Sequence, residues 1–126
     1  MGTWGHGNFE NDSAADHLAE LTRRLINEIT EAMKDPAELE PDEHWGCAVP
    51  VNIELLNLFA SREWDGGLVP EPSVVEQWKS TFMTAWEGSI DGLQPVPGFK
   101  EKRRAVLVAT FDELLAHARR THEEEA

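Results

Sequence analysis

The sequence predicts a single all-α domain of about four helices, preceded by an N-terminal loop rich in glycine and aromatic residues. Apolar residues recur every three or four positions in several long segments, and stretches with proline and glycine separate these segments. The length of 126 residues, with 40% hydrophobic content, suits one hydrophobic core. We therefore expect residues 1–126 to form one domain, with residues 1–12 as an anchored loop and residues 121–126 as a frayed acidic tail.

The N-terminal loop alternates glycines with large rings. The glycines are Gly2, Gly5 and Gly7, and the rings belong to Trp4, His6 and Phe9. This pattern allows sharp backbone bends while large rings pack against an apolar surface. We therefore expect Trp4 and Phe9 to be buried against the helices, so that Trp4→Ala would cost about 3–5 kcal/mol.

The first helix is expected from about Ser13 to Lys34. Asn11, Asp12 and Ser13 are consecutive N-cap candidates, and Ser13 with Asp16 has the spacing of a capping box. The Asp-Pro pair after Lys34 ends the helix. Its apolar stripe consists of Ala14, Leu18, Leu21, Leu25, Ile29 and Met33.

A second helix is expected after an acidic, solvated connector from Ala37 to Trp45. It begins at Cys47 or Val51, depending on how Pro50 is placed, and ends near Ala60. Because this segment is nearly apolar all round, it should lie at the centre of the fold. A buried strand is the competing interpretation, but the length of the segment and the spacing of its polar residues favour a helix.

The third helix is expected from Ser73 to about Glu87, with Ser73 and Glu76 as a capping box and Gly88 as its C-cap. Its apolar positions are Val74, Trp78, Phe82 and Trp86. The last helix is expected from about Lys100 to Arg120. Its apolar face consists of Val108, Phe111, Leu114, Leu115 and Ala118.

The start of the chain also carries the pattern Trp4-Gly5-x-Gly7-x-Phe9-x-Asn11-Asp12-x-Ala14-x-Asp16. This pattern resembles the opening of an uncharacterised family of short bacterial proteins, known as domain of unknown function 4259. Over the rest of the chain the similarity is mostly one of helix order. The resemblance implies a small helical fold and no activity.

Charge and cysteine content narrow the function classes. The chain has 24 acidic and 11 basic residues and a formal net charge of −13. Such a charge repels nucleic acids and anionic membranes, and it favours either a basic protein partner or simple solubility. The carboxylates concentrate at 38–43 and 123–125. The single cysteine, Cys47, excludes an internal disulfide and a cysteine-rich zinc site, and it indicates a reducing cytoplasm.

The sequence contains no catalytic constellation and no cofactor motif. Side chains that could bind a divalent metal lie close together in the N-terminal region, but their spacing is not that of a metal motif. These side chains are His6, Asp12, Asp16 and His17, with His44 or Glu54 as partners brought in by folding. We therefore predict no metal and no cofactor. We also expect no signal peptide and no membrane span.

Two function classes remain open, and the oligomeric state is open as well. The first is a binding or regulatory module, for example an immunity-like protein, whose acidic surface neutralises a basic partner. The second is a small hydrolase or ligand-binding protein with a pocket near Trp4, His6 and Glu54. The candidate ligand or partner residues are Trp4, His6, Asn11, Asp12, Asp16 and Glu54.

Glu54 is the carboxylate in the middle of the apolar second helix. We expect it to be at least partly buried, and a buried carboxylate needs hydrogen-bond partners. The indole N–H of Trp4 and the backbone of the glycine loop are candidate donors. On this hypothesis Glu54 ties the N-terminal loop to the second helix, and a catalytic or ligand-binding role is the alternative.

Overall fold

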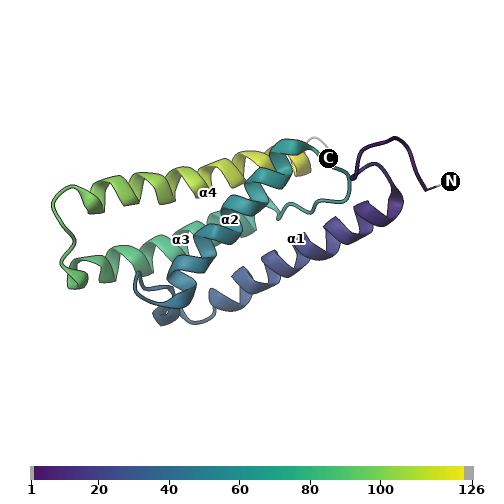
Figure 1. The fold of residues 1–126 in the computed structure, drawn as a ribbon. Helices are drawn as coiled ribbons and strands as arrows, with labels where there is room; N and C mark the ends of the chain where they lie inside the picture. Colours follow the sequence, from purple (N-terminus) through teal and green to yellow (C-terminus); the bar gives the residue numbers. More distant parts are fainter. Residues whose placement is uncertain (1, 124–126) are drawn as a thin grey trace.

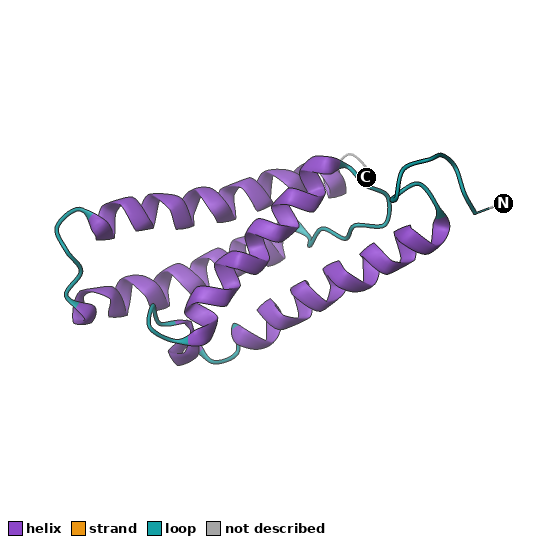
Figure 2. Ribbon diagram, viewed as in Figure 1, coloured by secondary structure: helices purple, strands orange, loops and turns teal. Residues whose placement is uncertain are grey.

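The computed structural model describes residues 2–123, and this range contains four α-helices and two short 3₁₀ helices. Figure 2 shows helices joined by loops, and no strand is formed within this range apart from an isolated bridge. The prediction of a single all-α domain is confirmed. The helices are α1 (Asp12–Ala32), η1 (Pro36–Leu39), α2 (His44–Arg62), α3 (Pro72–Ser89), η2 (Ile90–Leu93) and α4 (Phe99–Glu123). Of the expected acidic tail, residues 121–123 continue α4, and residues 124–126 lie outside the described residues.

α2 packs against α1 on one side and against α4 on the other, and α3 packs against α4. In Figure 1, α2 crosses the view between α1 and α4. The short helix η1 contacts both α2 and α3 and closes one end of the bundle. The N-terminal loop and the end of α4 lie at the opposite end (Figure 1). One core therefore runs through all four helices.

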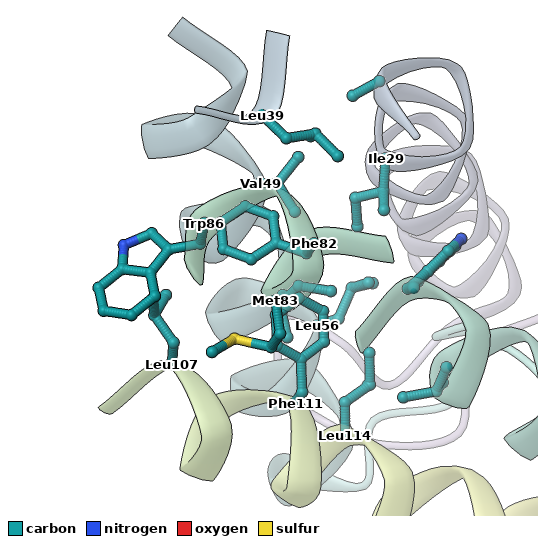
Figure 3. Packing of buried hydrophobic residues seen from close by; sticks show 14 of the residues in the cluster. Ile29, Leu39, Val49, Leu56, Phe82, Met83, Trp86, Leu107, Phe111 and Leu114 are labelled. Carbon is teal, nitrogen blue, oxygen red and sulfur yellow. The ribbon is translucent and has the colours of Figure 1, made fainter. Parts of the chain in front are cut away.

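The core joins α1, η1, α2, α3 and α4 through apolar side chains (Figure 3). Phe82 of α3 and Phe111 of α4 are fully buried, and their ring centroids are 5.5 Å apart. Leu39 of η1 is also fully buried. The segment from Ala37 to Trp45 was expected to be a solvated connector, and this is wrong at the buried Leu39 and at His44 and Trp45, which begin α2. Leu39 anchors it because one apolar side chain among carboxylates is enough to fold a short turn onto the core.

The helix ends differ from the expected capping boxes. Asn11 is the N-cap of α1, and its side-chain oxygen accepts a hydrogen bond of 2.8 Å from the backbone N–H of Ala14. Ser13 therefore lies inside the helix. α3 begins at Pro72, whose fixed φ angle and missing N–H suit the first helical position. The expected capping box at Ser73 is wrong for this reason.

The limits of α2 and α3 also differ from the predicted ones. α2 starts at His44 and contains Pro50 in its interior, whereas the sequence placed this proline near the first turn. Gly46 lies four residues before Pro50, where the ring of a helical proline meets the preceding turn. Gly88 lies inside α3, and Gln94 with a φ of 51° ends the η2 segment that follows. α2 is only partly central, because its inner side is buried and its outer side is exposed.

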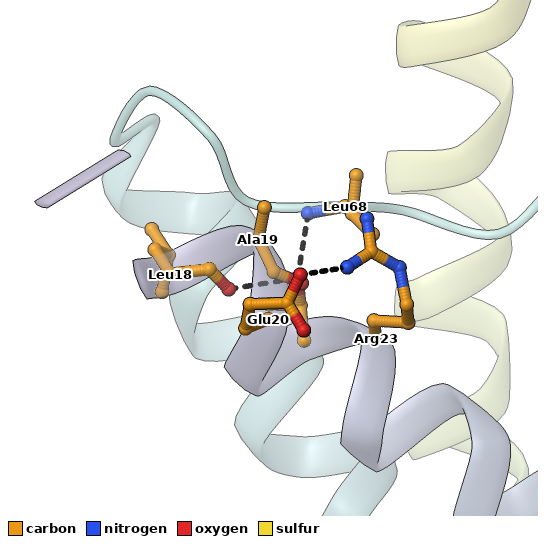
Figure 4. Close-up of polar contacts among 6 residues, drawn as sticks. Leu18, Ala19, Glu20, Arg23 and Leu68 are labelled. Atoms are coloured by element: carbon orange, nitrogen blue, oxygen red, sulfur yellow. Dashed lines mark hydrogen bonds and ion pairs between the residues drawn. The ribbon is translucent and has the colours of Figure 1, made fainter. Parts of the chain in front are cut away.

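The connection between α2 and α3 is fixed to α1. The backbone N–H of Leu68 donates a hydrogen bond of 3.0 Å to the buried hydroxyl of Thr22, which itself donates to the carbonyl of Leu18. Figure 4 shows Leu68 beside the α1 residues Leu18 and Ala19. Gly66 has a φ of 93°, and a Cβ atom there would overlap the backbone of Ala15. Only glycine therefore permits this close approach.

The N-terminal loop folds back on itself as a short hairpin. The backbone N–H of Trp4 donates to the carbonyl of Glu10 at 2.8 Å, and that of Asp12 donates to Gly2 at 2.6 Å. The ring of Phe9 stacks on Trp64, with 3.8 Å between centroids and an angle of 4° between planes. Trp4, however, is 48% exposed, so the expectation that both rings are buried is confirmed for Phe9 only in part and is wrong for Trp4.

The stacked pair gives a prediction for the loop. Phe9→Ala should lower the free energy of unfolding by about 1–2 kcal/mol, because it removes a ring stack and part of the buried apolar area. Trp4→Ala should cost clearly less, since half of that ring is already in water. Urea denaturation of both variants measures the difference. A larger loss for Trp4→Ala than for Phe9→Ala would contradict the observed anchoring.

Candidate functional site

The structure places the N-terminal site candidates in and beside the hairpin. The indole N–H of Trp4 donates to the carboxylate of Asp12 at 3.0 Å, and Asn11 caps α1. His6 and Asp16 are exposed. Among the described residues, the N-terminal histidines and aspartates do not form a cluster with metal-binding distances. The polar groups of Trp4, Asn11 and Asp12 therefore make hydrogen bonds within the hairpin and the start of α1.

Glu54 lies elsewhere and is exposed. It lines a small groove of about 120 Å³ between α2 and α4, together with Arg103 and Val106. The hypothesis that Glu54 ties the loop to α2 is wrong, because Trp4 bonds to Asp12 instead. Ile53, the residue before Glu54, is fully buried and marks the side of α2 that faces the core. Each residue of a helix turns by about 100°, so the side chain that follows Ile53 points away from the core.

A groove of about 450 Å³ runs along α1 to the start of α2. We call it the acidic groove. Its lining combines four carboxylates with two arginines, an asparagine, an alanine and one half-buried tryptophan. The residues are Glu20, Arg23, Arg24, Asn27, Glu28, Glu31 and Ala32 of α1, Glu38 of η1 and Trp45 of α2. The groove thus offers negative charge beside an aromatic surface.

The carboxylates of α1 in this groove already have local partners. Glu20 pairs with Arg23, as Figure 4 shows, and Glu31 pairs with Lys34 at 2.8 Å. Glu28 lies 3.5 Å from Arg24 and accepts a hydrogen bond of 3.0 Å from the side chain of Asn52. Exposed ion pairs of this kind contribute about 0–1 kcal/mol each. An incoming cation can therefore displace them at little cost.

Trp45 is the second residue of α2, and its side chain is half-buried. It packs against the hydrophobic core, and its ring meets that of His44 edge-on, with 4.9 Å between centroids. A tryptophan face attracts a lysine or arginine side chain through its aliphatic stem and its charge. With Glu31 and Glu38 in the same groove, Trp45 completes a surface suited to a cationic side chain.

The acidic groove continues into a segment without lysine or arginine. Positions 35–61 contain six carboxylates and no lysine or arginine, so this stretch carries a charge of −6 out of a total of −13. Three of these residues, Glu40, Asp42 and Glu43, have carboxylate oxygens within 4.8 Å of one another. Such crowding of like charges raises the local attraction for a cationic partner.

Sequence reasoning identified the carboxylates at 38–43 but not the groove. Trp45 and Glu31 are 14 positions apart in the sequence, and they share a surface only because α1 and α2 pack together. The absence of lysine and arginine from 35–61 could have indicated this region from the sequence, since the acidic groups there have no basic neighbours along the chain.

The described residues thus form a small all-α domain that carries the acidic groove on α1, η1 and α2. Within the described range, no helix has the length and apolar character needed to cross a membrane. The family described as a domain of unknown function (DUF4259) matches residues 2–120, and the chain belongs to this family. No curated protein and no solved structure matches the chain.

Proposed function

We propose that this domain is a binding module that recognises a basic segment of a protein partner through the acidic groove. The observation that carries the proposal is the composition of the groove. Four carboxylates, two arginines and the half-buried Trp45 line it, and its residues Glu38 and Trp45 belong to the stretch 35–61, which contains no lysine or arginine.

In this proposal a lysine or arginine of the partner lays its aliphatic stem against Trp45 and places its charge near Glu31 and Glu38. The local ion pairs of α1 exchange for pairs with the partner, which changes the number of ion pairs little but buries apolar surface on Trp45. The net charge of −13 accelerates the encounter with a basic protein and disfavours nucleic acid. By covering the basic surface of its partner, the domain neutralises that protein, as an immunity-like protein does.

We also propose that the domain acts in the cytoplasm, where its free, exposed Cys47 thiol remains reduced. The alternative function, a hydrolase or ligand-binding protein with a pocket near Trp4, His6 and Glu54, has less support. Glu54 lines a groove between α2 and α4 whose lining includes neither Trp4 nor His6. No observation therefore favours this alternative.

A binding experiment with matched charge changes tests the proposal. The probe is a short synthetic peptide rich in lysine and arginine, and its affinity is measured by isothermal titration calorimetry. The double variant Glu31→Gln, Glu38→Gln should bind the peptide about fivefold or more weakly, at about 0.5–1 kcal/mol for each lost ion pair. The control Asp65→Asn, Glu71→Gln removes the same two charges at exposed positions outside the groove and should bind nearly as the parent chain does.

Salt provides a second readout in the same experiment. The affinity should fall steeply as salt rises, because screening acts over about 8–10 Å at physiological ionic strength. Equal losses in the two double variants would show that net charge alone attracts the peptide, and this result would contradict a role for the groove.

A further inference from the structure

A second groove, which shares no lining residue with the acidic groove, lies at the end of the bundle where α2 and α4 finish (Figure 1). Its lining comes from the last residues of α2, from the connection between α2 and α3, and from the end of α4. We call it the end groove. Its volume of about 210 Å³ is smaller than the roughly 300–1,000 Å³ of sites for drug-sized molecules, so it suits a small ligand.

One part of the end groove is apolar and aromatic. Phe59 of α2 and Trp64 of the connection both line it, and their ring centroids are 6.2 Å apart with 40° between the planes. Leu68 and Val69 add aliphatic side chains to the same lining. The ring of Phe9 stacks on Trp64 and thereby holds the indole in place. The end groove therefore offers a surface for one apolar side chain of a ligand.

The lining also carries both signs of charge. Glu63, the C-cap of α2, and Arg120 of α4 line the end groove, and both are exposed. The guanidinium of Arg62 lies 5.8 Å from the ring centroid of Trp64 and adds a cation beside the groove. α2 and α4 both end here, and the C-terminal end of a helix favours a positive group. A ligand with a single charge would meet a like charge, whereas a zwitterion has a partner for each sign.

Polar contacts hold the two sides of the end groove in position. Nη2 of Arg120 donates to Nδ1 of the buried His117 at 2.6 Å, because arginine has donors only. Nε2 of His122 donates to the carbonyl of Val69 at 2.7 Å and ties the connection to α4. The same connection is hydrogen-bonded to α1. A site that is already in place loses less free energy to ordering when a ligand binds.

We propose that the end groove binds a free amino acid with an apolar side chain. The side chain of the ligand packs against Phe59 and Trp64, which removes apolar surface from water. Its carboxylate accepts hydrogen bonds from Arg120 and from the hydroxyl of Thr121, and its ammonium group pairs with Glu63 at the end of α2. Each charged group of the lining then has an opposite charge to meet.

Isothermal titration calorimetry with L-phenylalanine and L-leucine tests the proposal on the full chain. At least one of them should bind with a dissociation constant of about 1 mM or tighter. The analogues 3-phenylpropanoate, without the ammonium group, and phenethylamine, without the carboxylate, should each bind at least about tenfold more weakly than L-phenylalanine or L-leucine, whichever binds more tightly, because each leaves one charge of the groove unpaired. No binding of either amino acid at about 10 mM, or equally tight binding of either analogue, would overturn the proposal.

Matched variants locate the binding site. Arg120→Gln and Glu63→Gln should each raise the dissociation constant of the bound amino acid about tenfold, since each removes one charge-assisted contact. The controls Arg119→Gln and Glu71→Gln make the same changes at exposed positions outside the lining and should bind as the parent chain does. Circular dichroism checks that all four variants are folded. Equal losses in the variants and their controls would overturn the assignment to the end groove.

The tryptophan signals separate this proposal from the proposed function. On titration of the nitrogen-15-labelled chain with the bound amino acid, the indole N–H signal of Trp64 should shift and that of Trp45 should stay in place. A shift of Trp45 without one of Trp64 would overturn the end groove as the site. The double variant Glu31→Gln, Glu38→Gln should still bind the amino acid, and Arg120→Gln should still bind the basic peptide. The two proposals can therefore fail independently.

Discussion

Replacement of Phe82 by alanine should lower the free energy of unfolding by about 3–5 kcal/mol, the usual cost of truncating a buried aromatic residue. Phe82 is fully buried, and its ring lies 5.5 Å from that of Phe111, so the substitution opens a cavity between α3 and α4. Domains of this size are stable by about 5–15 kcal/mol, and the loss is therefore a large part of the total. Urea denaturation followed by circular dichroism measures it.

Phe99→Ala is the matched control, because it removes the same side chain from a position that is 47% exposed. We expect it to cost about 1 kcal/mol or less. Equal losses in the two variants would contradict the position of the core between α3 and α4.

Gly46→Ala should have the second-largest effect, about 3 kcal/mol, at the upper end of the range for overpacked sites. A Cβ atom at Gly46 would overlap the carbonyl oxygen of Glu40 and lie 2.9 Å from that of Leu39. Both contacts are to backbone, which cannot turn away as a side chain can. The substitution should therefore displace η1 and Trp45, and it should weaken binding of the basic peptide as well as lower stability.

Gly88→Ala controls for the general effect of alanine in a helix. Gly88 lies in α3, and a Cβ atom there meets no atom within 4 Å. Since alanine favours helix over glycine, this variant should be as stable as the parent or more stable by up to about 1 kcal/mol. A destabilised Gly88→Ala together with a stable Gly46→Ala would contradict the close packing of η1 against α2.

The fold was predictable because helical periodicity is local. Phe111, Leu114 and Ala118 were expected on the apolar face of the last helix, and all three are buried. The errors occurred where one residue permits two local structures. Pro50 is compatible with a first turn as well as with a helix interior, and Leu39 is a single apolar residue without a period around it.

The candidate site was predictable only in its charge. The stack of Phe9 on Trp64 joins residues 55 positions apart, so no local pattern indicates which ring of the loop is anchored. Glu54 was expected inside because its helix is apolar on most sides, but the outer side of α2 is the side left open. Trp45 and the glutamates of α1 form one groove only after the helices pack.

The most direct test of the proposed binding groove is the indole N–H spectrum of the nitrogen-15-labelled chain during titration with the lysine- and arginine-rich peptide. The chain has five tryptophans, and each gives its own signal: Trp4, Trp45, Trp64, Trp78 and Trp86. We expect the signal of Trp45 to shift with saturation, while those of the buried Trp78 and Trp86 stay in place. A peptide that binds without moving the Trp45 signal, or that moves the exposed Trp4 instead, would contradict recognition through the acidic groove.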